Sequence, residues 1–128
     1  MNCVTSLANA CGCSICGRCA QFGSVDISRD KAKSAVALRR PTKAFQDLIA
    51  QGGANLRLLN IGYSVLEGGI PIIVGGKVIG SIGVSGVTSQ QDAQIAQAGI
   101  AMLVSRAFKQ LTEGAKQREF TNTRHFVY

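Results

Sequence analysis

The chain has 128 residues, of which 46% are hydrophobic and 16% are charged, and its formal net charge is +7. This composition is typical of one globular domain with a modest core and excludes a disordered chain. The longest apolar runs, such as residues 70–74, are far shorter than the roughly 20 residues of a membrane span, so we expect no membrane segment.

Residues 1–22 form an atypical, cysteine-rich segment without the basic and apolar regions of a secretory signal. Four of the chain's five cysteines cluster in the stretch CGCSICGRC, at Cys11, Cys13, Cys16 and Cys19. Thiolates at this spacing can share one zinc ion, although zinc ribbons usually separate two C-x-x-C pairs by a longer loop. A metal site and a group of reduced thiols both stay open as interpretations. The clustering differs from a spread disulfide framework and favours the reducing cytoplasm.

Two helices are expected next, divided at Pro41, because the residue before a proline is pushed out of the α region. The first begins at Ser24 or Asp26, both good N-cap residues, and its polar side includes Lys31. The second begins at Pro41 and ends before Gly52.

Residues 54–68 show no sustained period, and we expect an irregular loop, which in a compact domain is often functional. Two strand-like runs follow, IPIIV and KVIGSIGVSG, and the pair Gly75–Gly76 between them predicts a tight β-hairpin. Gly80 and Gly83 would weaken the second strand unless another element packs closely on it.

A long helix is expected from Ser89, with Ser89 and Asp92 placed as a capping box. The residues expected on its buried face are apolar: Ile95, Ala98, Met102 and Leu103. The polar tail at 112–128 lacks clear periodicity and is interpreted as an extension. This order of elements predicts an α+β domain with an antiparallel sheet.

Three stretches together resemble one known family: SVDISRDKAKSAVALRRPTKAF (24–45), LEGGIPIIVGGKVIGSIGVSG (66–86) and QQDAQIAQAG (90–99). In this order and spacing they resemble the GlcG/HbpS family of haem-binding-like proteins, which is related to the C-terminal domain of PduO-type adenosyltransferases. The resemblance covers about residues 20–105. It implies a profilin-like α+β fold, with an antiparallel β-sheet flanked by helices, and assembly into dimers or higher homo-oligomers.

The N-terminus departs from the family pattern. Family members usually have an amphipathic helix and two strands before the part that matches SVDIS, whereas only 23 residues precede it here. We therefore expect a sheet that lacks the family's N-terminal helix and first strands, and whose exposed edge favours pairing between chains. The expected divisions are residues 1–22, a GlcG/HbpS-like domain at 23–111, and the extension at 112–128.

The resemblance also implies haem binding, with haem-linked redox sensing or haem degradation in some members. The first candidate residues surround the break between the two helices, where helix N-termini and arginine forks suit anionic oxygens: Arg39, Arg40, Thr42 and Lys43. The second group lies in and before the EGG sequence: Tyr63, Glu67, Gly68 and Gly69. Purely structural roles stay open for Thr42, as a helix-start residue, and for Glu67, as a salt-bridge partner.

The lone histidine, His125, lies outside the resemblance. Since haem iron most often takes His, Cys, Met or Tyr, a thiolate of the cysteine cluster or an oxygen ligand would have to serve. No Ser–His–Asp set, paired carboxylates or P-loop spacing occurs in the recognised region, so independent catalysis is not expected. The basic residues lack interleaved aromatic side chains, which argues against nucleic acid as a partner.

We therefore interpret the chain as a small, cytoplasmic homo-oligomer that binds haem or a similar flat anionic ligand, in redox sensing or haem handling. Two alternatives stay open. One is a non-catalytic oligomerisation module without a cofactor. The other is a metal-binding protein that uses the cysteine cluster.

Overall fold

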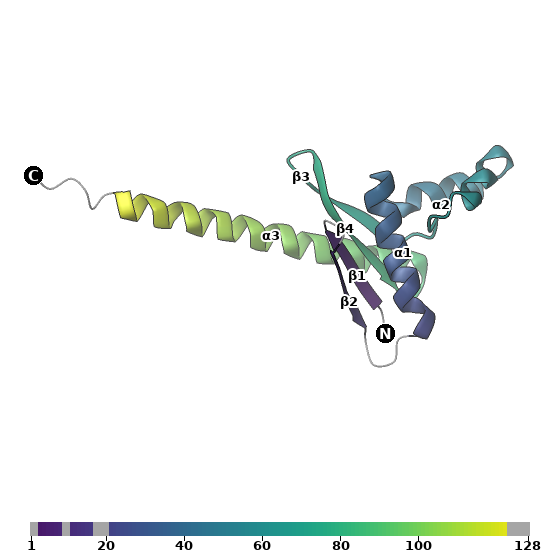
Figure 1. Ribbon diagram of the computed structural model, residues 1–128, viewed down its shortest axis with the longest axis horizontal. Coiled ribbons are helices and arrows are strands. Elements are labelled where there is room, and N and C mark those ends of the chain that lie inside the picture. Colours follow the sequence, from purple (N-terminus) through teal and green to yellow (C-terminus); the bar gives the residue numbers. More distant parts are fainter. Residues whose placement is uncertain (1–2, 9–10, 17–20, 123–128) are drawn as a thin grey trace, which may run out of the picture.

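The computed structural model describes the backbone of residues 3–8, 11–16 and 21–122 and the side chains of residues 21–106. Its elements, in chain order, are β1 (Cys3–Ala8), β2 (Cys11–Cys16), α1 (Phe22–Leu38), α2 (Thr42–Ala50), the 3-10 helix η1 (Gly53–Asn60), β3 (Gly69–Val74), β4 (Lys77–Ser85) and α3 (Ser89–Asn122). This arrangement is α+β, as predicted (Figure 1). None of the helices in the described part of the chain is both long and apolar enough to cross a membrane.

The described strands form one antiparallel sheet in the order β2-β1-β4-β3. The predicted hairpin is confirmed, since β3 and β4 meet at Gly75 and Gly76, whose φ angles of 57° and 77° suit a tight turn. The expectation that the first strands would be missing is wrong, because β1 and β2 form a second hairpin. Val4 of β1 stands opposite Val84 of β4, so β1 pairs with the edge of β4 as an antiparallel strand.

Helix α1 covers one face of the sheet at close range. A Cβ on Gly83 of β4 would collide with the Ser28 carbonyl oxygen and stand 2.6 Å from the Ala32 nitrogen. The Ser81 hydroxyl donates to the Ala32 carbonyl oxygen at 2.7 Å. This close approach supplies the packing that a glycine within a strand needs. It also explains the small and polar buried face of the helix: Ser24, Ser28, Lys31, Ala32, Ser34 and Ala35.

The expectation that Lys31 lies on the polar side of this helix is wrong, because the residue is only 2% exposed. Lysine at that position continues the helical spacing of Ser24 and Ser28 and so faces the sheet rather than water.

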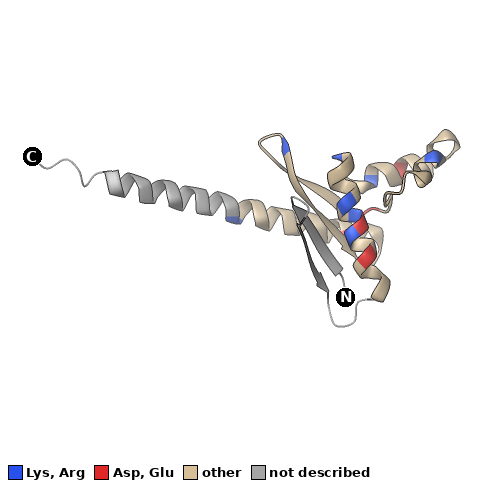
Figure 2. Ribbon diagram, in the orientation of Figure 1, with Lys and Arg blue, Asp and Glu red and all other residues tan. Residues whose placement is uncertain are grey.

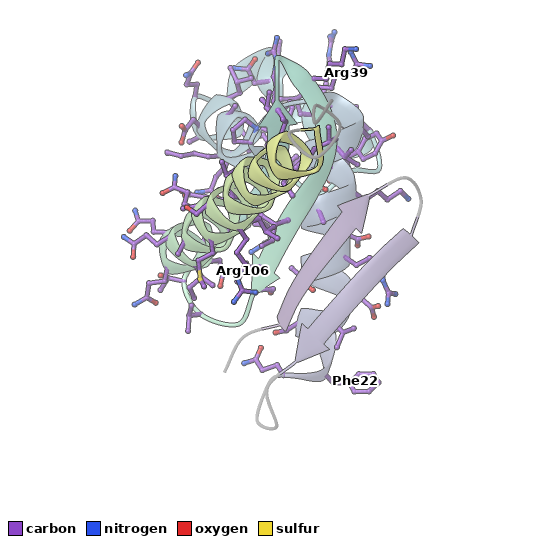
Figure 3. All side chains as sticks on the ribbon, turned by 90° about the vertical axis from the view of Figure 1, so that its left-hand side faces the viewer. Phe22, Arg39 and Arg106 are labelled. Atoms are coloured by element: carbon purple, nitrogen blue, oxygen red, sulfur yellow. The ribbon has the colours of Figure 1, made fainter. Side chains whose placement is uncertain are left out.

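The first part of α3 covers the opposite face (Figure 3). The core cluster there is apolar: Ile82, Val84 and Ala96, with Ile70 and Ile100 packed against it. The predicted buried face of this helix is wrong, since Ile95 and Met102 are 38% and 61% exposed. Ala98 and Leu103 are exposed as well. Beyond the sheet, α3 projects away from the other elements to Asn122, across the boundary expected at 111 (Figure 1).

The capping box of α3 lies one residue earlier than predicted. The Gln91 N–H donates to Thr88 Oγ1, and the Thr88 N–H donates to Gln91 Oε1, both at 3.4 Å. This is the reciprocal pattern of a Thr-x-x-Gln box. Asp92 is therefore not part of the capping box. It is buried, with an exposed fraction of 2%.

Candidate functional site

A cavity of about 190 Å³ lies between the start of α2, the start of β3 and the first turns of α3. Its lining combines small, apolar and ionisable residues: Pro41, Lys43, Glu67, Gly68, Gly69, Ile70, Ala93 and Gln97. The structure thus brings together four of the residues predicted from the sequence to bind a ligand, namely Lys43, Glu67, Gly68 and Gly69. We call it the Glu67 cavity. Figure 2 shows acidic and basic positions gathered over α1, α2 and the segment after η1.

Two glycines let the wall of the Glu67 cavity approach α1. A Cβ on Gly68, whose φ is +125°, would stand 2.8 Å from the Val84 carbonyl oxygen and 2.9 Å from Lys31 Nζ. A Cβ on Gly69 would collide with the Lys31 carbonyl oxygen. The protein itself therefore requires glycine at both positions, whether or not a ligand is bound.

Thr42, the first residue of α2, is fully buried beneath the Glu67 cavity. The Gly69 N–H donates to Thr42 Oγ1 at 2.9 Å, and the Thr42 hydroxyl donates to the Gly69 carbonyl oxygen at 3.4 Å. These two contacts fix the start of β3 against the start of α2. The hydroxyl is thus engaged with the backbone, in line with the structural role left open for Thr42.

Below Gly68 lies an ion pair that the sequence analysis missed. Lys31 Nζ stands 2.9 Å from Asp92 Oδ2 and also donates to the Val84 carbonyl oxygen at 2.9 Å. Both side chains are 2% exposed, and the pair links α1 to α3 past the end of β4. A buried ion pair is tolerated only when its partners are hydrogen-bonded, as they are here.

Glu67 is the chemically available group of the Glu67 cavity. The residue is 6% exposed, and its backbone N–H donates to Gln46 Oε1 at 2.9 Å. Its carboxylate lines the cavity and makes no hydrogen bond or ion pair with any residue of the part described with side chains. The alternative of a salt bridge to an arginine is therefore not seen among those residues. A nearly buried, unpartnered carboxylate is a strong candidate for contact with a ligand or proton.

Lys43 stands at the mouth of the cavity with its side chain 56% exposed. Its Nζ donates to both carboxylate oxygens of Asp47, at 2.8 and 2.9 Å. The hydrogen bond to Asp47 is the largest of the causes that raise the pKa of Lys43 above its ordinary 10.5, and the charge of Glu67 adds to it. Lys43 therefore supplies a permanent positive charge beside the cavity.

Other predicted residues do not line the Glu67 cavity. Arg39 and Arg40 are exposed after the end of α1, where Arg39 adopts a left-handed φ of 52° as the C-cap. Figure 3 shows Arg39 at the opposite end of α1 from Phe22. Tyr63 is half-buried and lies in the loop that follows η1.

The proposed metal ligands lie outside the residues described with side chains. The backbone of β2 includes Cys11, Cys13 and Cys16, whereas Cys19 lies outside the described residues. Among the residues described with side chains, which do not include the cysteine cluster, no group of three or more His, Cys, Asp or Glu could hold a metal ion.

A family model described as "Haem degrading protein HbpS-like" matches residues 13–101. The match begins inside the cysteine-rich stretch, further toward the N-terminus than the resemblance at about residues 20–105.

Curated relatives match parts of the chain. A 15.0 kDa protein from the dhaT–dhaS intergenic region of Citrobacter freundii is 41% identical over 80 residues, which cover 60% of this chain and 56% of that protein. GlcG of Escherichia coli strain K12 is 43% identical over 59 residues, which cover 46% of this chain and 43% of GlcG. The chain thus spans about half the length of these relatives.

Solved structures agree over a longer stretch. The crystal structure of HbpS superposes with a TM-score of 0.71 and 30% identity, over 80% of this chain and 73% of that chain. The crystal structure of the PduOC:heme complex superposes with a TM-score of 0.69 and 28% identity, over 78% of this chain and 76% of that chain. The chain therefore shares the fold of both structures over the parts that superpose.

Proposed function

The chain belongs to the HbpS-like family, and from this premise we propose that it binds haem or a similar flat anionic ligand at the Glu67 cavity. The observation on which the proposal rests is the Glu67 carboxylate: the residue is only 6% exposed, yet its carboxylate has no hydrogen-bond or ion-pair partner among the residues described with side chains. The similarity to a structure solved with haem supports the same ligand class.

The residues fit one edge of such a ligand. A cavity of about 190 Å³ is smaller than the roughly 300–1,000 Å³ of ordinary ligand pockets, so one chain covers only part of a porphyrin. The ammonium of Lys43 suits a propionate, and Ile70 and Ala93 offer an apolar wall. The lining residues described with side chains include no His, Cys, Met or Tyr, so an iron ligand of the usual kind would have to come from outside them.

We infer that a second copy of the chain completes the site. Exposed apolar side chains occur on the hairpin and on α3, with Ile73 54%, Ile79 51% and Met102 61% exposed. A second copy that covered these side chains would remove their apolar surface from water, which favours association. A dimer would also shield the exposed part of the ligand. Haem, when bound, would supply the iron-centred redox chemistry that redox sensing or haem handling requires.

The experiment is a titration of the purified protein with hemin. We expect a shifted Soret band that saturates at micromolar hemin. The affinity for hemin should fall about tenfold in Glu67→Gln, because the negative charge that would face the positive iron centre is lost. Asp30→Asn is the matched control, since it removes an exposed carboxylate on α1 outside the cavity lining. A wild-type protein without a Soret shift would remove haem from the proposal. Equal affinities of the two variants for hemin would show that Glu67 does not contribute to binding.

The main alternative is an interaction module without a cofactor, which the exposed apolar residues of α3 favour. An oligomer that forms without hemin, binds none and dissociates in Met102→Glu would support this alternative. The second alternative, a metal site at the cysteine cluster, is tested by metal analysis. Stoichiometric zinc in protein purified without added metal, and loss of stability on chelation, would support a metal site in the reducing cytoplasm, the compartment that we propose.

A further inference from the structure

A second cavity, of about 250 Å³, opens where the first turns of α1 and α3 meet the end of β4. Its lining includes Ser24, Lys31, Ser85 and Asp92, and it shares no lining residue with the Glu67 cavity. It lies at the Phe22 end of α1, the end opposite Arg39 in Figure 3. We call it the serine cavity.

Two serine hydroxyls in the serine cavity have no hydrogen-bond partner among the residues described with side chains. Ser24 is 3% exposed and Ser85 is 6% exposed, yet neither hydroxyl makes a hydrogen bond with the residues described with side chains. No side-chain polar atom in that part of the chain is both fully buried and without a partner, so these hydroxyls keep their contact with solvent through the cavity. Two other buried serines are satisfied: Ser34 donates to the Asp30 carbonyl oxygen and Ser81 to that of Ala32, each at 2.7 Å.

The electrostatics of the serine cavity favour an anion of single charge. The N-termini of two helices open onto it, and each is equivalent to about half a positive charge. The α1 terminus has no side-chain cap and no acidic residue in its first turn. Of the three N–H donors of Lys31, two are bonded to Val84 and Asp92. The Asp92 charge is met by Lys31 and by the Val87 N–H at 3.3 Å.

The shape of the serine cavity adds a second requirement. Its volume corresponds to about eight water molecules, which suits a ligand of few non-hydrogen atoms. Apolar side chains with substantial exposure form its rim: Ile27 at 39%, Leu66 at 48% and Val87 at 49%. We propose that the serine cavity binds a short aliphatic carboxylate, with the carboxylate on the Ser24 and Ser85 hydroxyls and the alkyl chain against this rim.

Butyrate is the probe, titrated into isotopically labelled protein while amide NMR shifts of residues 21–25 and 85–92 are followed. We expect saturable shifts with butyrate and none with the neutral isostere butyramide. Ser24→Ala and Ser85→Ala should each weaken butyrate binding about tenfold, because a hydrogen bond to a charged group is lost. Ser34→Ala, a change of the same kind on the same helix, should leave the affinity unchanged.

The proposal is overturned if butyrate produces no saturable shift in the wild-type protein, if butyramide binds equally well, or if Ser34→Ala weakens binding as much as Ser24→Ala does. Removal of a hydroxyl without a protein partner should not unfold the chain, and the amide spectrum of each variant checks this. Haem binding fails or succeeds separately, because hemin is read from the Soret band and Glu67 lines only the other cavity.

Discussion

The two faces of the sheet are held by different means. On the α1 face the contacts are short and polar, through Gly83, the Ser81 hydroxyl and the buried Lys31. On the α3 face they are apolar, among Ile82, Val84 and their neighbours. The difference indicates that the α1 face depends on exact backbone fit and satisfied polar groups, whereas the α3 face depends on buried apolar area. Substitutions on the first face should therefore be less tolerated than substitutions on the second.

The largest effect is expected at the ion pair that joins the two faces. Lys31→Met should lower the free energy of unfolding by about 3–5 kcal/mol, because it leaves the buried Asp92 charge without its partner. Urea denaturation measures this. Adding Asp92→Leu should restore a large part of the loss, since an apolar pair replaces the uncompensated charge. A double variant as unstable as the single one would show that packing, rather than charge, dominates at this position.

A glycine on each face allows the same substitution to be compared between the α1 face and the α3 face. Gly83→Ala should destabilise the protein by about 3 kcal/mol, because the new Cβ meets rigid backbone of α1. Gly99→Ala is the matched change on the α3 face, where the new Cβ would stand 3.0 Å from Ile82 Cδ1, the mobile end of a side chain. Alanine has a higher helix propensity than glycine, and this gain should offset the cost of the close contact. The free energy of unfolding should therefore stay nearly unchanged. Equal losses in thermal denaturation would contradict the distinction between the faces.

On the α3 face, the loss of stability caused by a truncated side chain should grow with the buried apolar area that is removed. Val84→Ala removes part of a fully buried side chain and should cost about 2 kcal/mol. Ile79→Ala, at a position 51% exposed in the same strand, should cost much less. Urea midpoints compare the two variants. An Ile79 effect as large as that of Val84 would instead indicate that a second chain buries Ile79.

The smallest effect is expected at the exposed pair of Lys43 and Asp47. Because Asp47 raises the pKa of Lys43 above 10.5, the stabilisation is fully present below that pH and is lost as the pH rises through the higher pKa of the folded state. Asp47→Asn should remove this slight dependence. Thermal unfolding at pH 9 to 12 measures it, and added salt should reduce it. If the pH dependence of stability persisted in Asp47→Asn, it would arise from a titratable group other than Lys43.

The candidate site was predicted in part. Lys43 and the EGG sequence were found from charge, glycine content and the family resemblance, and they meet in one cavity. The ion pair of Lys31 and Asp92 was not found, because a lysine within a helix is ordinarily assigned to the solvent side. The spacing of Lys31 from Ser24 and Ser28 was the available signal, but serines do not mark a buried face by themselves.

The local features of the fold could be predicted from the amino-acid sequence. The break at Pro41, the hairpin at Gly75 and the α+β order follow from φ preferences and from apolar spacing within short windows. The burial of Lys31 depends on the tertiary fold, since its partner Asp92 is 61 residues away in the sequence. The pairing of β1 with β4 was decided in the same way. Such contacts depend on which surfaces meet in space, and no local periodicity encodes that.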